Sequence, residues 1–499
     1  MRLIKLPGGR DVQKNRPAVH RRLRLSLRKL KPGNRWVVTA GKIPWDDVER
    51  GYAAGFVNNG APAHPARMAL DTLIARQVLS VPDEELCSQV AENPCLQFFI
   101  GLKEFAGECP VGASTLVAFR KRFNDEDVSR VNDSTLAKAR AETTEGGTDD
   151  GGGGAGGEAT MALDATAAPS DIACPPGHQA FERGEAVAGA RHRHHLRPGR
   201  REEAQGIPAK GPGDYLRWPK PKKRGAKMMR AAMRRQLAYV RRDLCYVSRL
   251  AKRCLPELTR VQRQRQETVG ARFAQQLFMQ ENKTRSVPGR IVSLPQPWVR
   301  PIVRSKARAN TELGVKAHAS TDDNGMARAD RVGFGPFNES ELLKVPAEEL
   351  HRREGIWPDR VLVDRIYRTR ANTAWCAERS TRLSGPMLGR RPKDDEANRQ
   401  AKATERKDAA DRNVVERVFG AAKRAYGMDP VRARLEETIK TVIALAILAY
   451  NLKKLTTASL CLCLELYLAL IRRLSTTVCR VICLARADKA ATPVLIGVT

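Results

Sequence analysis

Two aspartates and one glutamate have the types and spacing of a metal-dependent active site. Residues 161–164 and 361–364 are short apolar strands that each end in an aspartate. The ends of neighbouring parallel strands meet at one sheet edge, where ligands and metals gather. Glu416 follows Arg412 by four residues and precedes Lys423 by seven, which places all three on one helix face. The pattern predicts two strand carboxylates and one helix carboxylate flanked by bases.

Three such carboxylates suit a definite chemistry. Carboxylate oxygens are the hard ligands that Mg²⁺ prefers. They can bridge two ions about 4 Å apart, one activating the attacking oxygen and the other stabilising the leaving oxygen. A single aspartate at a strand end is most often structural or solvated, so the prediction depends on the combination with a basic chain. Asp164, Asp364 and Glu416 are the predicted catalytic residues and metal ligands.

The charge of the chain points to nucleic acid as its partner. The 88 Lys and Arg residues exceed the 55 Asp and Glu residues by 33, and the calculated pI is about 10.2. A field of this sign attracts polyanions over long distances. Only 5% of residues are aromatic, which disfavours base stacking on single strands and favours contact with the duplex backbone. The apolar content of 42% is enough for a folded core in two or three domains.

Nothing in the sequence predicts export or a membrane partner. The first ten residues carry three positive charges but no apolar run of signal-peptide length, so the cytoplasm is the expected compartment. The eleven cysteines include no CxxC pair and are expected to be reduced thiols. Charged residues interrupt the apolar stretch 460–484, which is expected to be an amphipathic helix and not a membrane span.

Composition divides the chain into five parts. The expected order is a basic arm (1–34), a helical DNA-binding domain (35–140), a Gly-rich linker (141–159), a catalytic domain (160–455) and an apolar helical tail (456–499). Apolar spacing and capping residues in the second part predict helices at 43–56, 66–81, 83–90 and 114–123. Short helices that end in a basic run are typical of a helix-turn-helix domain. The alternative is a helical domain that only docks on its neighbour.

The catalytic part contains an irregular stretch and a basic one. Residues 175–213 are rich in Pro, Gly, Arg and His, carry almost nothing to bury, and suggest a segment read out of frame. The three histidines at 192, 194 and 195 lack the partners of a zinc site. The region 215–285 is expected to be a basic helical insertion, because 215–253 holds fourteen Lys or Arg residues against Asp243 alone. Phosphate contact is expected there, including Lys222, Lys223 and Arg224.

The rest of the catalytic part alternates strands and helices. Strands at 314–320 and 326–333 flank an Asn-Gly pair, which predicts a hairpin. The expected elements that follow are a helix at 340–354, a strand at 360–364, a helix, a short strand near Leu383, and helices at 393–426 and 430–455.

Several ordered sequence blocks resemble one known family. They include Ile43-Pro-Trp-Asp, Val81-Pro-Asp-Glu-Glu, Glu92-Asn-Pro-Cys-Leu-Gln-Phe-Phe-Ile-Gly-Leu, Leu116-Val-Ala-Phe-Arg-Lys-Arg, Leu163-Asp-Ala-Thr, Gln296-Pro-Trp-Val-Arg-Pro-Ile-Val-Arg, Thr311-Glu-Leu-Gly-Val-Lys, Asn338-Glu-Ser, Val363-Asp-Arg-Ile-Tyr-Arg and Arg382-Leu-Ser-Gly-Pro. From about Asn34 to Leu455 the chain resembles the DDE transposases of bacterial insertion sequences, in the family named for insertion sequence five. The order of the blocks is more specific than any one of them.

The resemblance implies a fold and a function. It implies an α/β protein whose ribonuclease H-like catalytic domain contains a helical insertion and follows a small all-α DNA-binding domain. It also implies two Mg²⁺ or Mn²⁺ ions, binding of the element's terminal inverted repeats, cleavage at its ends, strand transfer into target DNA, and a homo-oligomer in the synaptic complex. The expected location is the cytoplasm, in association with the nucleoid.

The last family block departs from the pattern at one position. The family has Tyr, two residues, Arg, three residues, Glu, six residues, Lys; here Ala409 stands in the tyrosine position, while Arg412, Glu416 and Lys423 keep the spacing. Arg412 and Lys423 are therefore expected to contact DNA phosphates, together with Arg300 and Arg304 of the block from Gln296.

Two other function classes compete with this interpretation. A non-catalytic DNA-binding protein, such as a regulator or a decayed transposase, would share the charge and the helices but would not need the three carboxylates. The irregular stretch 175–213 favours such a decayed copy, with weak or no activity. An RNA-binding protein is the more distant alternative, because the sequence has no RRM-type aromatic motif and no KH-type GxxG.

Overall fold

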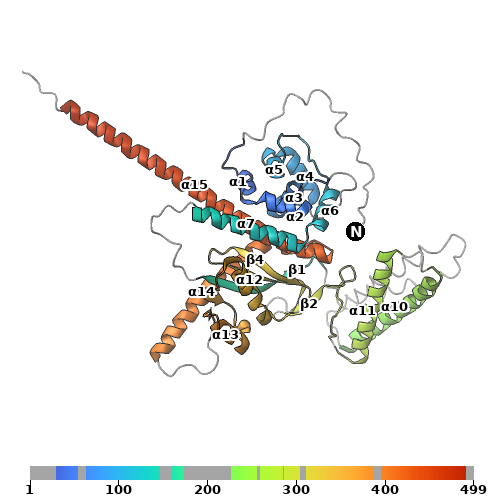
Figure 1. Ribbon diagram of the computed structural model, residues 1–499. Coiled ribbons are helices and arrows are strands. Elements are labelled where there is room, and N and C mark those ends of the chain that lie inside the picture. Colours follow the sequence, from blue (N-terminus) through green and yellow to red (C-terminus); the bar gives the residue numbers. More distant parts are fainter. Residues whose placement is uncertain are drawn as a thin grey trace, which may run out of the picture. The chain divides into compact units, whose positions relative to one another are not determined.

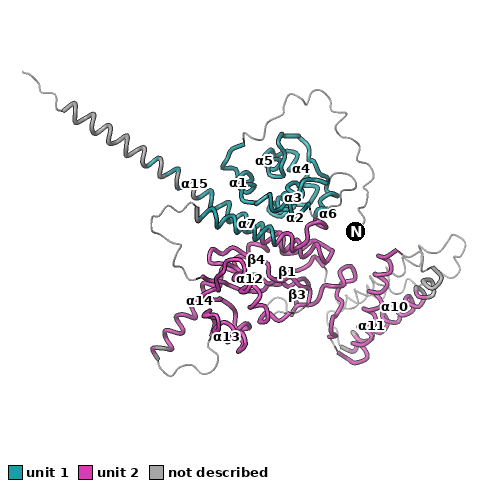
Figure 2. The backbone as a smooth tube through the Cα atoms, in the orientation of Figure 1, with its two compact units in different colours: residues 1–119, 130–151, 448–499 teal, residues 120–129, 152–447 magenta. Residues whose placement is uncertain are grey.

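The structure is a computed structural model, and it describes residues 30–53, 63–145, 159–172, 226–254, 259–284, 286–303, 311–335, 337–386 and 395–490. Two compact units share the chain (Figure 2). Unit 1 comprises residues 1–119, 130–151 and 448–499, and unit 2 comprises residues 120–129 and 152–447. The boundaries of the five parts expected from the sequence remain predictions.

The N-terminal elements are all helical. They are α1 (Arg35–Lys42), α2 (Trp45–Ala53), α3 (Ala66–Leu79), α4 (Asp83–Glu92), α5 (Pro94–Phe99), α6 (Ala113–Arg122) and α7 (Asp125–Glu145) (Figure 1). Helix α3 is buried on nearly every side, and the rings of Trp36 on α1 and Phe99 on α5 lie 5.0 Å apart. The helices predicted around α2, α3, α4 and α6 are confirmed with end points shifted by a few residues. Helices α1, α5 and α7 were not predicted.

A six-stranded sheet organises unit 2. Its strands are β1 (Thr160–Pro169), β2 (Arg300–Val303), β3 (Thr311–Thr321), β4 (Ala327–Gly333), β5 (Arg360–Leu362) and β6 (Arg382–Leu383). The order is β2-β3-β1-β5-β6, and β4 also pairs with β3. Strand β1 is antiparallel to β3 and parallel to β5, and β5 is parallel to β6. The sheet is therefore mixed, with β1 at its centre.

Strand β1 is longer than predicted. The strand was expected to end at Asp164, but its pairing with β3 continues to Pro169, opposite Gly314. A Cβ atom on Gly314 would lie 2.1 Å from the carbonyl oxygen of Ala168, so only glycine allows the two backbones to approach this closely. The prediction was wrong because pairing with a distant strand extends a weakly strand-forming stretch.

The predicted hairpin is confirmed by β3 and β4 and the turn that joins them. Gly325 has φ +62° and donates its N–H to the carbonyl of Asp322 at 2.8 Å. The Asp322 side chain accepts from the N–H of Met326 at 2.8 Å. The turn thus uses the positive φ that the Asn-Gly pair predicts.

Mainly helical elements follow the hairpin in the sequence. The elements after the hairpin are the short 3-10 helices η5 (Glu339–Leu342) and η6 (Arg365–Tyr367), with α12 (Lys344–Glu354), α13 (Arg370–Ala377), α14 (Asp395–Ala425) and α15 (Glu436–Ala490). The single helix expected at 340–354 is η5 followed by α12, and the helix expected at 393–426 is confirmed as α14. Helix α15 is continuous, whereas the sequence predicted a helix at 430–455 and a separate tail.

Two further helices follow β1 in the sequence. Helix α10 (Ala226–Cys254) and helix α11 (Arg260–Glu281) pack through Leu237, Val240 and Val269. Thr259 and Gln262 form a capping box at the start of α11. The basic amphipathic helix predicted here is confirmed over 226–254.

Some predictions fall outside the described residues. These are the basic arm before residue 30, the irregular stretch 175–213, and the predicted DNA contacts Lys222, Lys223, Arg224 and Arg304. In the part of the chain that the structure describes, no helix combines the length and apolarity needed to cross a bilayer.

Candidate active site

Asp164 and Asp364 lie at matching positions on neighbouring parallel strands. Ala162 of β1 pairs with Leu362 of β5, and each aspartate follows two residues later. The parallel pairing predicted from the sequence is confirmed. The surroundings differ, since Asp164 lies within β1 while Asp364 caps the 3-10 helix η6 just beyond β5. Each carboxylate accepts the N–H of the next residue, at 2.8 Å for Ala165 and 2.6 Å for Arg365.

The alternation of side chains assigns Asp164 to the sheet face that α14 covers. Met161, Leu163, Val361 and Val363 belong to the core cluster that includes Tyr367 and Trp375. Ala162 and Leu362 instead pack against Val415 and Phe419 of α14. Because side chains two residues apart along a strand share a face, Asp164 faces the helix that carries Glu416, in agreement with its contact to Arg412. Asp364 follows Leu362 of the same face by two residues, just beyond the end of β5.

Arg412 connects the strand carboxylate to the helix carboxylate. Its Nη2 lies 3.1 Å from Glu416 Oε1, one helical turn away, and its Nη1 lies 3.9 Å from Asp164 Oδ2. The side chain of Asp164 is 20% exposed and that of Glu416 is 52% exposed. The guanidinium therefore lies between two carboxyl groups at the sheet surface while Glu416 stays accessible. Lys423 lies on the same helix and is half-buried.

The environment of Asp164 opposes its ionisation. Burial raises the pKa of Asp164 above its usual value, and the negative charges of Glu339 and Glu416 raise it further. The N–H of Ala165 and the charge of Arg412 act in the opposite direction. A nearby positive charge favours the ionised form of such a carboxyl group, and Arg412 supplies one here.

Glu339 is a fourth acid near this site, and the sequence did not identify it. Its Oε1 lies 2.7 Å from Lys316 Nζ, and both side chains are largely buried. Lys316 also donates to the carbonyl of Phe337 at 3.0 Å. The block Asn338-Glu-Ser indicated that this region matters. No spacing rule links Glu339 to Asp164, however, since 174 residues and a strand crossover separate them.

The candidate ligand atoms are of the chemical type that divalent metal ions bind. Asp164, Asp364 and Glu416 offer only carboxylate oxygens, the ligands of Mg²⁺ and Mn²⁺. Among the residues that the structure describes, no three His, Cys, Asp or Glu side chains are grouped closely enough to hold an ion. Arg412 occupies the space between two of the carboxylates and supplies positive charge there.

Arg300, predicted to contact DNA, is described. It begins β2 and its side chain donates to the carbonyls of Pro297 and Val299, the latter at 3.2 Å. Its role in DNA binding remains a prediction.

Two models of known protein families match separate regions of the chain. Residues 361–453 match the model of the Transposase DDE domain, and residues 25–122 match the Transposase domain (DUF772). The first match includes Asp364 and Glu416. In these two regions the chain is similar to transposases.

One curated relative shares part of the sequence. It is the uncharacterized protein ORF8 in the nfe locus of Rhizobium meliloti, 29% identical over 110 residues. The alignment covers 22% of this chain and 53% of that protein, so the chain spans about half the length of this relative. No solved structure matches the chain.

Proposed function

We propose that this protein is an insertion-sequence transposase that binds the terminal inverted repeats of its element, cuts DNA at their ends and joins the ends to target DNA. One observation carries the proposal. Asp164 of β1 and Asp364 just beyond β5 each follow by two residues a pair of strand residues, Ala162 and Leu362, that packs on the helix of Glu416. The match to the DDE domain includes two of these three residues.

The sheet supports a ribonuclease H-like catalytic fold. The path β4-β3-β1-β5-β6 combines antiparallel pairing on one side of β1 with parallel pairing on the other. Its central strand carries the first carboxylate. Helix α14, which carries the third, packs on β1, β3 and β5 through Val415 and Phe419.

Each polar residue of the site has a definite role in this proposal. Asp164, Asp364 and Glu416 would hold the ions, and Lys316 binds Glu339 near them. Bound Mg²⁺ would activate the attacking oxygen and stabilise the leaving oxygen at the scissile phosphate. Arg412 orients Glu416 and, with Lys423, receives DNA phosphates at the mouth of the site.

DNA is the proposed partner, held mainly through its phosphates. Helices α10 and α11 expose a set of basic side chains, namely Lys227, Arg230, Arg234, Arg235, Arg241, Arg260, Arg263 and Arg265. Arg300, Arg304, Lys222, Lys223 and Arg224 are proposed as further contacts. A homo-oligomer would bring the two ends of the element together, and the protein would act in the cytoplasm at the nucleoid.

The second candidate is a transposase-derived DNA-binding protein that no longer cuts. The observation that favours it is that the described carboxylates do not form a three-ligand group. Such a protein would bind the element's ends in a metal-independent manner.

A nicking assay separates the two functions. The full-length protein is incubated with a labelled duplex carrying the element's own ends, with Mg²⁺, Mn²⁺ or EDTA, beside a duplex with scrambled ends. The proposal predicts metal-dependent nicks at the ends of the first duplex only. Tight binding to the first duplex with no nick under any condition would support the non-catalytic protein and contradict the proposed function.

A further inference from the structure

The segment Arg382–Gly385 contacts the strand end that carries Asp364. The N–H of Ser384 donates to the carbonyl of Val361 at 2.9 Å. Its hydroxyl oxygen accepts the N–H of Val363, the residue before Asp364, at 2.9 Å. Arg368, which follows η6, donates to the carbonyls of Leu383 and Gly385, each at 2.9 Å. The backbone before Asp364 and the side chain of Arg368 after it are thus both bonded to this segment.

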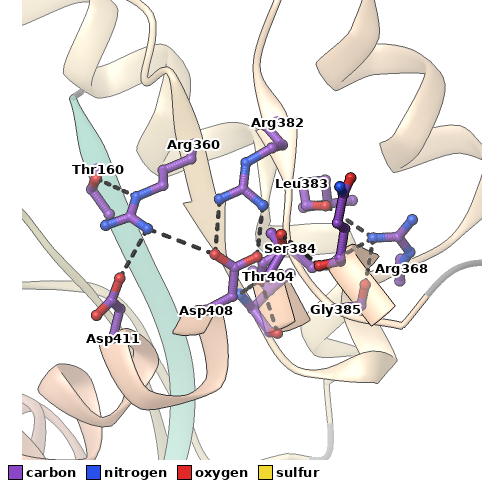
Figure 3. A network of polar contacts seen from close by, with 12 residues as sticks. Thr160, Arg360, Arg368, Arg382, Leu383, Ser384, Gly385, Thr404, Asp408 and Asp411 are labelled. Carbon is purple, nitrogen blue, oxygen red and sulfur yellow. Dashed lines mark hydrogen bonds and ion pairs between the residues drawn. The ribbon is translucent and has the colours of Figure 1, made fainter. Parts of the chain in front are cut away.

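The same segment contacts the helix that carries Glu416. Arg382 binds both carboxylate oxygens of Asp408 on α14, at 2.7 and 2.8 Å (Figure 3). Asp408 is buried, with 4% of its surface exposed. A two-point contact between a guanidinium and a carboxylate fixes direction as well as distance.

A second arginine ties the helix to the central strand. Arg360 lies 2.9 Å from Asp411 and 3.6 Å from Asp408, and its Nε donates to the hydroxyl of Thr160 on β1 at 2.7 Å (Figure 3). Asp408 and Asp411 precede Arg412 by four residues and one residue, on the turn of α14 that leads to the site. The contacts therefore set the rotation and height of α14 above the sheet.

We infer that the segment Arg382–Gly385 positions Glu416 relative to Asp364, with Arg382 and Ser384 as positioning residues. The inference rests on the proposed function, in which these two carboxylates share bound metal. Metal ligands on a strand end and on a helix keep a fixed separation only if other contacts fix the strand end relative to the helix. Here the four-residue segment Arg382–Gly385 makes contacts to both. Residues behind the ligands commonly affect metal affinity or activity by about 10- to 100-fold.

The test measures Mn²⁺ affinity of the full-length protein by the electron paramagnetic resonance signal of free Mn²⁺. Arg382→Lys keeps the charge but loses the two-point contact, and Ser384→Ala removes the acceptor of the Val363 N–H. Each is expected to weaken Mn²⁺ binding by about 10- to 100-fold, with the thermal midpoint well above the assay temperature and duplex binding in EDTA unchanged. Neither residue is a ligand, so a merely structural contact would leave the affinity unaltered.

Arg352→Lys is the matched control. Arg352 also makes a two-point contact with a carboxylate, that of Glu349 within α12, and its substitution should leave Mn²⁺ affinity unchanged. Wild-type affinity in both Arg382→Lys and Ser384→Ala, or an equal loss in Arg352→Lys, would overturn the inference while the proposed function stands. If Arg382→Lys does not fold, Ser384→Ala decides alone. A wild-type protein that binds no Mn²⁺ would overturn the proposed function and the inference with it.

Discussion

Tyr367 buries its hydroxyl group in the core of unit 2. The side chain is fully buried within the cluster of Leu163, Val363 and Trp375. Burial raises the pKa of Tyr367 above its usual value, and the negative charges of Glu339 and Asp164 add to the increase. Among the described residues, its oxygen has no hydrogen-bond partner. The phenol is therefore held neutral in an apolar environment.

Replacing Tyr367 by phenylalanine should not destabilise the protein. Tyr367→Phe keeps the ring and removes an unsatisfied hydroxyl, so the free energy of unfolding should stay equal or rise by about 1 kcal/mol. Urea unfolding of the full chain measures it, and Tyr467→Phe, at a 60% exposed position on α15, is the control. A loss of more than about 1 kcal/mol would mean that the hydroxyl has a bonded partner.

Asp71 on α3 is a buried acid in unit 1. Burial raises the pKa of Asp71 well above its usual value, and Arg67 opposes the increase. Arg67 Nε lies 3.6 Å from the carboxylate and also donates to the carbonyls of Phe98 and Phe99. Because the folded chain holds this proton more tightly, the stability it contributes is fully present below pH 3.8 and is lost as pH rises through the raised pKa.

Asp71→Asn should therefore stabilise the protein at pH 7 and change little near pH 4. Each pKa unit between the unfolded and folded states corresponds to about 1.4 kcal/mol, and Arg67 keeps its two carbonyl partners in the variant. Unfolding curves at both pH values measure the effect, with Asp47→Asn at an exposed position as control. Destabilisation that is larger at pH 7 than near pH 4 would show that the ion pair outweighs the cost of burial.

The sequence alone could single out the three predicted carboxylates because each lies in a short local pattern. Asp164 and Asp364 end apolar runs, and Glu416 has the four-residue spacing to Arg412. Glu339 and Asp408 carry no such signal, since their partners Lys316 and Arg382 become neighbours only when the sheet forms. Roles that depend on contacts between distant segments need the fold.

At the scale of elements, α10 and α11 form a basic helical pair. The two helices bury apolar residues between them, namely Leu237 and Val240 of α10 and Val269 of α11. Phe273 packs against these residues. The exposed sides carry mainly arginine, including Arg234 and Arg235. A surface with so little compensating negative charge suits a polyanion.

This surface should dominate the salt dependence of DNA binding. Six to ten phosphate contacts would lower affinity by about 10³- to 10⁵-fold between 50 and 200 mM salt, and each contact adds about 0.9 to the slope of log affinity against log salt. Arg234→Gln with Arg235→Gln should reduce that slope by about 2. Glu267→Gln, an exposed acid on α11, should not reduce it. An affinity that stays flat across this salt range would contradict phosphate-dominated binding.

Helices and strands were predicted correctly where the local sequence pattern was strong. They were missed where the element depends on pairing with a distant strand or where its sequence is too polar to show a periodic apolar pattern. Helix α14 and the hairpin have clear local patterns. The end of β1 depends on β3, and α7 is too polar for an apolar stripe. Its start could have been recognised from Asn124 and Asp127, because Asn124 accepts the N–H of Asp127 at 2.7 Å and Asp127 accepts the N–H of Asn124 at 3.3 Å.

At the scale of the whole molecule, the two transposase-like features of the sequence fall mainly in different units. Unit 1 contains most of the region matched by the second transposase domain, and unit 2 contains all three predicted carboxylates. The excess of 33 positive charges belongs to the chain as a whole. A substitution of one carboxylate is therefore expected to impair cleavage without impairing DNA binding, because it barely changes the total charge.

The most direct test of the account compares cleavage and DNA binding in Asp364→Asn. Asparagine can also cap η6 by accepting the Arg365 N–H, so the local fold should persist while a metal ligand is lost. Losing several kcal/mol of transition-state stabilisation should reduce Mg²⁺-dependent nicking by about 100-fold or more. Duplex affinity should stay within about twofold of wild type because no phosphate donor is removed, and Glu348→Gln, exposed on α12, should match wild type in both assays. Undiminished nicking by Asp364→Asn, or equal loss of nicking and DNA binding, would contradict the assignment of Asp364 as a metal ligand.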